Sequence, residues 1–210
     1  MMPQTAVQQT GHTGQDRSTA ASGARRFARQ AGIVVASTVL VALCAHISIP
    51  LGFTPVPITL QPFAVLLLGL VLAPQISFAA LSLYLLEGAA GLPVFSPHGL
   101  GGIAQLFGPT GGYLLAAPFA AAVAGLIYRH GKRKFLPALA GAAAGDVILL
   151  AIGTLWLGAL THMGLSTLLS EAVVPFLASD AAKVVAAAAC AQIFASFSGT
   201  SFSRRSPQAE

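Results

Sequence analysis

Charged residues are scarce in this chain: Asp, Glu, Lys and Arg together make up 8% of its 210 residues. A soluble domain carries roughly 25% charged residues, because its surface faces water. Hydrophobic residues account for 55% of the chain, and the mean hydropathy is +0.78. So few charges cannot cover a water-facing surface. The sequence therefore predicts an all-α integral membrane protein surrounded by membrane lipid, since apolar runs cross a bilayer as helices.

Disulfide, metal and nucleotide sites are missing as well. The two cysteines, Cys44 and Cys190, lie in apolar runs and give neither a disulfide framework nor a metal-ligand spacing. Gly125 and Gly131-Lys132 come near a P-loop, but five residues separate the glycines, and Arg133 stands where Ser or Thr binds magnesium. We therefore expect no cofactor and no ATPase activity in this chain. Energy for any pumping has to come from an ion gradient or a partner.

Two further function classes are excluded by what is absent. Basic and aromatic residues are nowhere interleaved, so the net charge of +5 does not indicate nucleic-acid binding. A membrane enzyme needs a nucleophile and a base at one depth, and no histidine lies within helical reach of a Ser or Cys in the apolar runs. We predict that the chain is not an enzyme.

The chain divides into three parts. Residues 1–30 are polar and have no apolar core, which predicts a disordered cytoplasmic leader and not a cleavable signal peptide. Residues 31–197 form the predicted membrane domain, and residues 198–210 a cytoplasmic tail. Apolar runs long enough to cross a bilayer, about 17–25 residues, predict six transmembrane helices. These lie near 31–49, 58–73, 75–90, 110–129, 135–158 and 173–197.

Basic residues set the orientation of these helices. Ten of the eleven Lys and Arg residues fall in three clusters, namely Arg17, Arg25, Arg26 and Arg29; Arg129, Lys132, Arg133 and Lys134; and Arg204 and Arg205. Six crossings place all three clusters on one side, which the positive-inside rule identifies as the cytoplasm. Both termini then lie in the cytoplasm, and the protein is expected in the cell membrane. The external connections are 50–57, 91–109 and 159–172.

Lys183 is the eleventh basic residue, and it stands inside an apolar run three positions after Asp180. The spacing i, i+3 puts both on one helix face, about 10 Å below the outer end of the predicted helix. An ionisable residue in a membrane helix indicates a functional site. The alternative is an ion pair that only holds helices together, although an apolar pair would be as stable. We predict a polar site for a ligand that offers N–H donors and a carbonyl or negative oxygen.

Two of the predicted external segments lie above Asp180 and Lys183. Residues 50–57 contain three prolines and are therefore stiff. The second segment, which includes 91–109, is apolar and contains eight glycines, so it can fold closely over a ligand as a lid. The lid or gate residues are Phe95, Gly101, Gly102, Gly111 and Gly112. The eight glycines between 88 and 112 are Gly88, Gly91, Gly99, Gly101, Gly102, Gly108, Gly111 and Gly112.

Four more polar residues converge on the level of Asp180 and are expected in the same ligand site. They are Gln61, Glu87, Gln105 and Tyr113. Asp146 lies halfway along a helix with no evident basic partner. A protonated carboxyl facing a neighbouring helix is the favoured interpretation, and a proton-coupling group is the alternative.

Aromatic and small residues mark two other surfaces of the predicted helices. Trp156 fits the interfacial aromatic belt. Small residues recur at Ala24, Ala28, Gly32 and Ala36, which lets another helix approach closely and suggests docking of a partner at Ala28, Gly32 and Ala36.

The motifs together resemble the BioY family, the biotin-capturing S components of energy-coupling factor transporters. They are Pro55-Val56-Pro57-Ile58-Thr59-Leu60-Gln61, Glu87-Gly88-Ala89-Ala90-Gly91-Leu92-Pro93-Val94-Phe95, Gly101-Gly102, and Gly108-Pro109-Thr110-Gly111-Gly112-Tyr113. The segment from Pro175-Phe176 to Asp180 and Lys183 resembles helix six of that family. The resemblance covers about residues 31–197.

The resemblance implies a six-helix S-component bundle that captures biotin from outside and delivers it inward. The partners implied are a transmembrane coupling protein and a pair of cytoplasmic ABC-type ATPases. Asp180 and Lys183 match positions that contact the biotin head, where ureido N–H groups suit Asp180 and the carbonyl oxygen suits Lys183. The biotin carboxylate needs another partner, such as lid N–H groups or Gln61.

Two departures and two alternatives remain open. The family commonly has Pro-Gly before the Asp, where this chain has Ala178-Ser179, and Ser96-Pro97-His98 replaces a Gly-rich block. The alternatives are a solitary ion-coupled vitamin carrier and an S component for another small vitamin.

Overall fold

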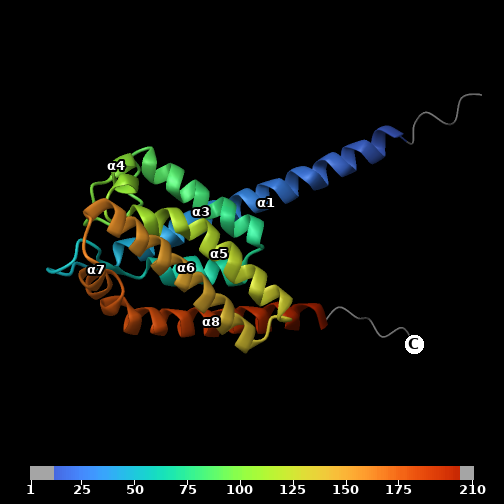
Figure 1. Ribbon diagram of the computed structural model, residues 1–210. Coiled ribbons are helices and arrows are strands. Elements are labelled where there is room, and N and C mark those ends of the chain that lie inside the picture. Colours follow the sequence, from blue (N-terminus) through green and yellow to red (C-terminus); the bar gives the residue numbers. More distant parts are fainter. Residues whose placement is uncertain (1–11, 204–210) are drawn as a thin grey trace, which may run out of the picture.

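The computed structural model describes residues 12–203, with side chains for residues 23–197. The described residues form eight helices and one two-stranded antiparallel ribbon (Figure 1). In chain order these are α1 (His12–His46), β1 (Ser48–Ile49), β2 (Ile58–Thr59), α2 (Gln61–Val71), α3 (Pro74–Ala89), α4 (Gly102–Phe107), α5 (Gly111–His130), α6 (Phe135–Thr161), α7 (Leu165–Ala172) and α8 (Val174–Ser203).

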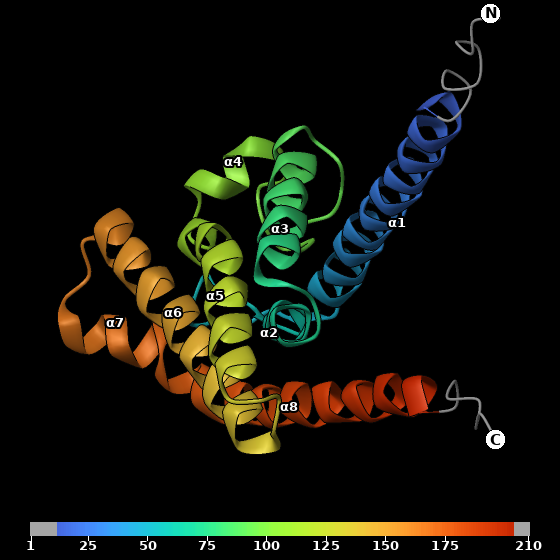
Figure 2. The same ribbon diagram turned by 90° about the vertical axis from the view of Figure 1, so that its right-hand side faces the viewer.

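Helix α2 lies in the middle of the bundle and packs against α1, α5, α6 and α8 (Figure 2). The neighbouring helices α5 and α6 run along each other and share the most extensive packing. Small residues allow this closeness, because a Cβ at Gly141 of α6 would collide with the backbone of Ala124 in α5. Helix α2 approaches α5 in the same way, since a Cβ at Gly69 would collide with the backbone of Ala121. Close backbone approach at small residues is typical of helices that associate within a membrane.

The outer surface of the bundle is apolar. Large hydrophobic side chains such as Leu43, Leu155 and Phe194 are more than half exposed, whereas the polar residues Asp146, Asp180 and Lys183 are buried. Such a surface is stable in lipid and would aggregate in water. Four helical stretches of the described residues are long and apolar enough to cross a membrane, namely Gly23–His46, Gly111–His130, Phe135–Thr161 and Leu165–Phe197. The chain is thus a mostly helical membrane protein.

The six predicted helices correspond to α1, α2, α3, α5, α6 and α8. One boundary was misplaced, because α1 begins at His12 and residues 12–30, which we expected to be disordered, are helical. Ala, Arg and Gln recur in this segment and are strong helix formers. The helix extends away from the bundle (Figure 1), and its residues 23–30 are exposed. Helix α8 likewise continues to Ser203, into the predicted tail. Residues 1–11 and 204–210 lie outside the described residues.

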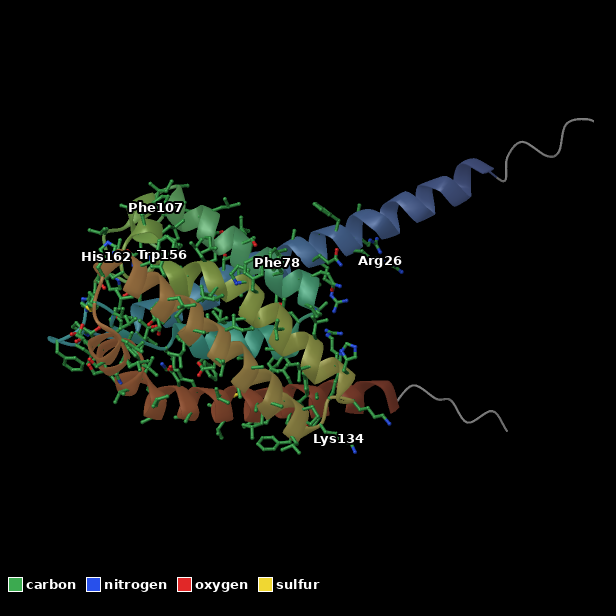
Figure 3. The ribbon with its side chains drawn as sticks, in the orientation of Figure 1. Arg26, Phe78, Phe107, Lys134, Trp156 and His162 are labelled. Atoms are coloured by element: carbon green, nitrogen blue, oxygen red, sulfur yellow. The ribbon has the colours of Figure 1, made fainter. Side chains whose placement is uncertain are left out.

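The two ends of the bundle differ in chemistry. The first residues of α1 and the last residues of α8 extend from the same end, where Arg26 and Lys134 also lie (Figures 1 and 3). Phe107, Trp156 and His162 lie at the opposite end, which is built by α4, α7 and the long connections (Figure 3). Arg26 and Lys134 are thus separated along the bundle axis from Phe107 and Trp156, and the end that carries Phe107 and Trp156 is called the aromatic end from here on.

The connections at the aromatic end are ordered by short-range contacts. Ser48 pairs with Thr59 and Ile49 with Ile58, so the ribbon closes the proline-rich loop into a hairpin. Residues 91–109, called the lid from here on, begin with a contact in which the Tyr84 hydroxyl donates to the Val94 carbonyl at 3.0 Å. Phe95 then packs edge-on against the Tyr84 ring, with ring centroids 5.4 Å apart. The lid is therefore anchored to α3.

Candidate functional site

A cavity lies beneath the lid, between α2, α5, α6 and α8. It holds about 720 Å³ of atom-free space, with its open part included. Ligand pockets typically have apolar walls with a few placed polar groups. Val65, Leu114, Leu149 and Phe176 are among the apolar residues of its wall. The polar residues lining it are Thr59, Gln61, Ser96, Gln105, Thr110, Tyr113, Asp146, Asp180 and Lys183.

The buried ion pair predicted from the sequence forms in this cavity. Lys183 Nζ donates to Asp180 Oδ1 at 2.7 Å, and the two residues are 8% and 4% exposed. Both project from α8, where their i, i+3 spacing puts them on one face. Because apolar walls surround the pair, its charges are only weakly screened. The second carboxylate oxygen of Asp180, Oδ2, is free to accept a hydrogen bond from a ligand.

Ser179 adds a hydroxyl to this pair. Its Oγ lies 2.9 Å from the Phe176 carbonyl, 3.3 Å from Asp180 Oδ1 and 3.4 Å from Lys183 Nζ. One hydroxyl hydrogen serves a single acceptor, so Oγ donates to either oxygen while it accepts from Lys183. The departure Ala178-Ser179 therefore keeps a continuous helix at Asp180 and supplies a further contact to the ammonium group.

Gln105 ties the lid together above the cavity. Its side chain is 2% exposed; Oε1 accepts from the Gly101 N–H at 3.0 Å, and Nε2 donates to Thr110 Oγ1 at 3.3 Å. Gly99 makes room for this amide, because a Cβ there would occupy the same space. A second cavity, lined by His98, Leu100 and Pro109 among others, shares Gln105 and Thr110 with the first. Gln105 thus stands between this outer vestibule and the ligand cavity.

The positive φ angles of two predicted lid glycines show why side chains are disfavoured there. Gly101 and Gly102 have φ of 71° and 56°, in the left-handed region, as α4 begins. Gly111 and Gly112 open α5 against Trp156, and a Cβ at Gly112 would collide with that ring. Only backbone can therefore pass Trp156 at this point.

Trp156 fastens the end of the lid. Its Nε1 donates to the Gly108 carbonyl at 2.9 Å, so the indole acts as an anchor as well as lying at the aromatic end of the bundle. Tyr113 lines the cavity from the first turn of α5, and its hydroxyl donates to the Ala172 carbonyl of α7 at 3.2 Å.

Of the remaining sequence-predicted site residues, Gln61 lines the cavity, whereas Glu87 and Phe95 are not part of its lining. Glu87 Oε1 accepts from Thr38 Oγ1 at 3.2 Å and so joins α3 to α1. Its part in ligand binding stays a prediction. Phe95 is 4% exposed and packs beneath the lid against Tyr84.

The small residues predicted as a docking face lie on the outer surface of the bundle. Ala28, Gly32 and Ala36 of α1 are exposed. Gly32 has nothing within 4 Å of where a Cβ would stand. The face is therefore open to a partner helix.

The sequence missed four polar residues of the cavity, namely Thr59, Ser96, Thr110 and Asp146. Asp146 faces it from α6, where we had favoured a contact with a neighbouring helix. Ser96 also lines it, and its Oγ is buried without a hydrogen-bond partner in the structure. Helical periodicity identifies a face but not its neighbour, and Ser96 lies in a loop without any period. Among the described residues, no group of three His, Cys, Asp or Glu is arranged to hold a metal ion.

Chemically, the cavity is suited to a mostly apolar molecule with a polar head. The ammonium group of Lys183 can bind a carbonyl oxygen, and Asp180 and Asp146 can accept N–H groups. The apolar walls bury aliphatic carbon and sulfur, and neutral donors lie at the lid. The arrangement therefore supports binding of such a molecule.

Comparison with solved structures supports the fold. The chain superposes on the crystal structure of the S-component for biotin from an ECF-type ABC transporter with a TM-score of 0.75. The match covers 82% of this chain and 93% of the other, at 24% sequence identity. At that identity the likeness establishes the shared S-component fold.

Sequence relatives identify the family. A probable biotin transporter BioY of Pyrococcus horikoshii is 38% identical over 165 residues, which cover 79% of this chain and 95% of the relative. The biotin transporter BioY of Thermotoga maritima is 42% identical over 151 residues, covering 72% and 86%. The model of the BioY family matches residues 14–199. This chain therefore belongs to the BioY family.

Proposed function

We propose that this chain is the substrate-binding membrane subunit of a biotin uptake system, which captures biotin from outside and delivers it inward. The observation that carries the proposal is the buried Asp180–Lys183 pair in an apolar cavity under a lid. Relatives named as biotin transporters support it.

Biotin matches the cavity group by group. Lys183 donates to the ureido carbonyl oxygen, and Asp180 Oδ2 accepts a ureido N–H. The fused rings and the valerate chain lie against apolar residues such as Val65, Leu149 and Phe176. The carboxylate points toward the lid, where the Gln61 amide, the Ser96 hydroxyl and backbone N–H groups are the available donors.

The membrane topology proposed is six crossings with both termini in the cytoplasm of a cell membrane. Helices α2 and α3 have 11 and 16 residues, so both are short for a bilayer about 30 Å thick, and the turn at Leu72 and Ala73 joins these two short crossings. The common direction of the α1 and α8 ends and the basic residues at that end support this orientation. The lid then faces outside.

Partners supply the energy in this proposal. A transmembrane coupling protein and a pair of cytoplasmic ATPases complete the transporter, because the chain has no P-loop of its own. The exposed small residues Ala28, Gly32 and Ala36 on α1 are a suitable docking face for a helix of the coupling protein.

Uptake is expected to require the coupling module. Proteoliposomes that contain this chain, a coupling protein and its ATPases should accumulate labelled biotin when ATP is present on the ATPase side, and should not do so with a non-hydrolysable analogue. An excess of riboflavin or thiamine should leave biotin uptake unchanged. Uptake by this chain alone that collapses with an uncoupler would instead establish an ion-coupled carrier, and competition by another vitamin would reassign the substrate.

A further inference from the structure

Asp146 is a third charged residue in the cavity, and it reaches the cavity from α6 while Asp180 and Lys183 come from α8. It is 8% exposed, and its carboxyl makes no hydrogen bond or ion pair with any residue that the structure describes. The charges of Asp180 and Lys183 interact electrostatically with the Asp146 carboxyl. A buried carboxyl without a partner costs free energy. It is therefore available to whatever enters the cavity.

The ureido ring of biotin is a cyclic urea, and its two N–H groups require two separate acceptors. In a five-membered ring the two N–H bonds point away from each other, on either side of the carbonyl group. One carboxylate cannot accept both. Asp180 Oδ1 already accepts from Lys183 at 2.7 Å and lies 3.3 Å from Ser179 Oγ, which leaves Oδ2 for one ligand N–H. The acceptor for the second N–H has to stand on another wall.

Asp146 is the carboxylate on such a wall. Its helix α6 packs against α8 along the cavity, and Leu149, one turn further, lines the same space. The other side-chain acceptors that line the cavity, apart from Asp180, are neutral and accept more weakly than a carboxylate; they are Thr59, Gln61, Ser96, Gln105, Thr110 and Tyr113.

We propose that Asp146 is a ligand-contacting residue that accepts the second ring N–H, opposite Asp180. This inference rests on the proposed function and adds a specificity rule to it. Carboxylates from α6 and α8 hold the ring from two sides, and Lys183 holds its carbonyl oxygen between them. The deep end of the cavity then selects rings with two N–H donors and repels a carboxylate, so the acidic end of a ligand has to point toward the lid.

The first test substitutes the residue. Asp146→Asn keeps the size of the side chain and removes its charge. Because a hydrogen bond to a charged acceptor is stronger than one to a neutral acceptor, we expect biotin affinity to fall about 10-fold or more in a calorimetric titration. Glu171→Gln in α7, outside the cavity lining, makes the same chemical change and should leave the affinity within about twofold. Unchanged affinity in Asp146→Asn would overturn the inference.

The second test changes the ligand and needs no variant to begin with. Biotin methylated at one or at the other ureido nitrogen should bind the wild-type protein at least about 10-fold more weakly in both cases, since each N–H has a charged acceptor. In Asp146→Ala, which leaves space for a methyl group, one of the two methyl penalties should shrink to about twofold while the other persists.

Three outcomes are thereby separated. If the wild type tolerates methylation of either nitrogen, the second acceptor does not exist and the inference fails. If both penalties persist in Asp146→Ala while its melting temperature drops, Asp146 has only a structural role and the inference fails. If the wild type binds no biotin, the proposed function itself fails.

Discussion

Lys183→Ala is expected to weaken biotin binding by about 100-fold or more. A hydrogen bond to a charged group contributes about 1.5–3 kcal/mol, and every 1.4 kcal/mol corresponds to a factor of ten. The substitution removes the donor to the ureido carbonyl oxygen. It also leaves Asp180, which is 4% exposed, without its counter-charge. Breaking a buried ion pair leaves an uncompensated buried charge and is strongly destabilising, so the substitution disturbs both halves of the site.

The effect is measured by titration calorimetry on purified protein in detergent, with the melting temperature followed in parallel. Lys134→Ala is the matched control, because Lys134 is exposed at the far end of the bundle (Figure 3). The double variant Lys183→Met with Asp180→Asn removes the buried charges together, and it should fold while it fails to bind. Full affinity in a folded Lys183→Ala protein would show that biotin lies elsewhere.

Gln105→Ala is expected to raise the rate of biotin dissociation about tenfold. Its amide makes two hydrogen bonds within the lid, to the Gly101 N–H and to Thr110 Oγ1. Each contributes about 0.5–1.5 kcal/mol net, and their loss also leaves a lid N–H without a partner. Because these bonds close the lid above the cavity without touching its deep end, the loss should be seen mainly in dissociation and much less in association.

The rate is followed by chasing labelled biotin from purified protein with an excess of unlabelled biotin. Gln75→Ala is the control, since Gln75 is exposed on α3 and away from the lid. Gly99→Ala should act in the same direction as Gln105→Ala, because a methyl group there displaces the Gln105 amide. A dissociation rate equal to that of the wild type in both lid variants would mean that Gln105 does not close the cavity.

The helices of the bundle were predictable because a bilayer imposes one strong rule: long apolar runs must be helical. The helix predicted at 135–158 does begin at Phe135, directly after the basic cluster that ends at Lys134. The start of α1 was not predictable from hydropathy. Residues 12–30 are polar, and their helix depends on local propensity and on continuation from the apolar part.

The site residues that could be predicted are those identified by their charge. Those identified only by the packing of helices and loops could not be predicted. Lys183 and Asp180 stood out because ionisable residues are costly in an apolar run. Asp146 was equally conspicuous, but its direction depends on how α6 is rotated against α8, which no single sequence pattern gives. Ser179 and the vestibule arise from contacts between segments, so they become visible only in three dimensions.

The central claim is that the cavity above Asp180 and Lys183 holds biotin. The most direct measurement is a calorimetric titration of biotin into purified wild-type protein, prepared from biotin-starved cells so that the cavity is not already filled. The account predicts saturable binding of one biotin per chain at micromolar concentration or below. Absence of binding at micromolar biotin, in protein that unfolds cooperatively on heating, would contradict it.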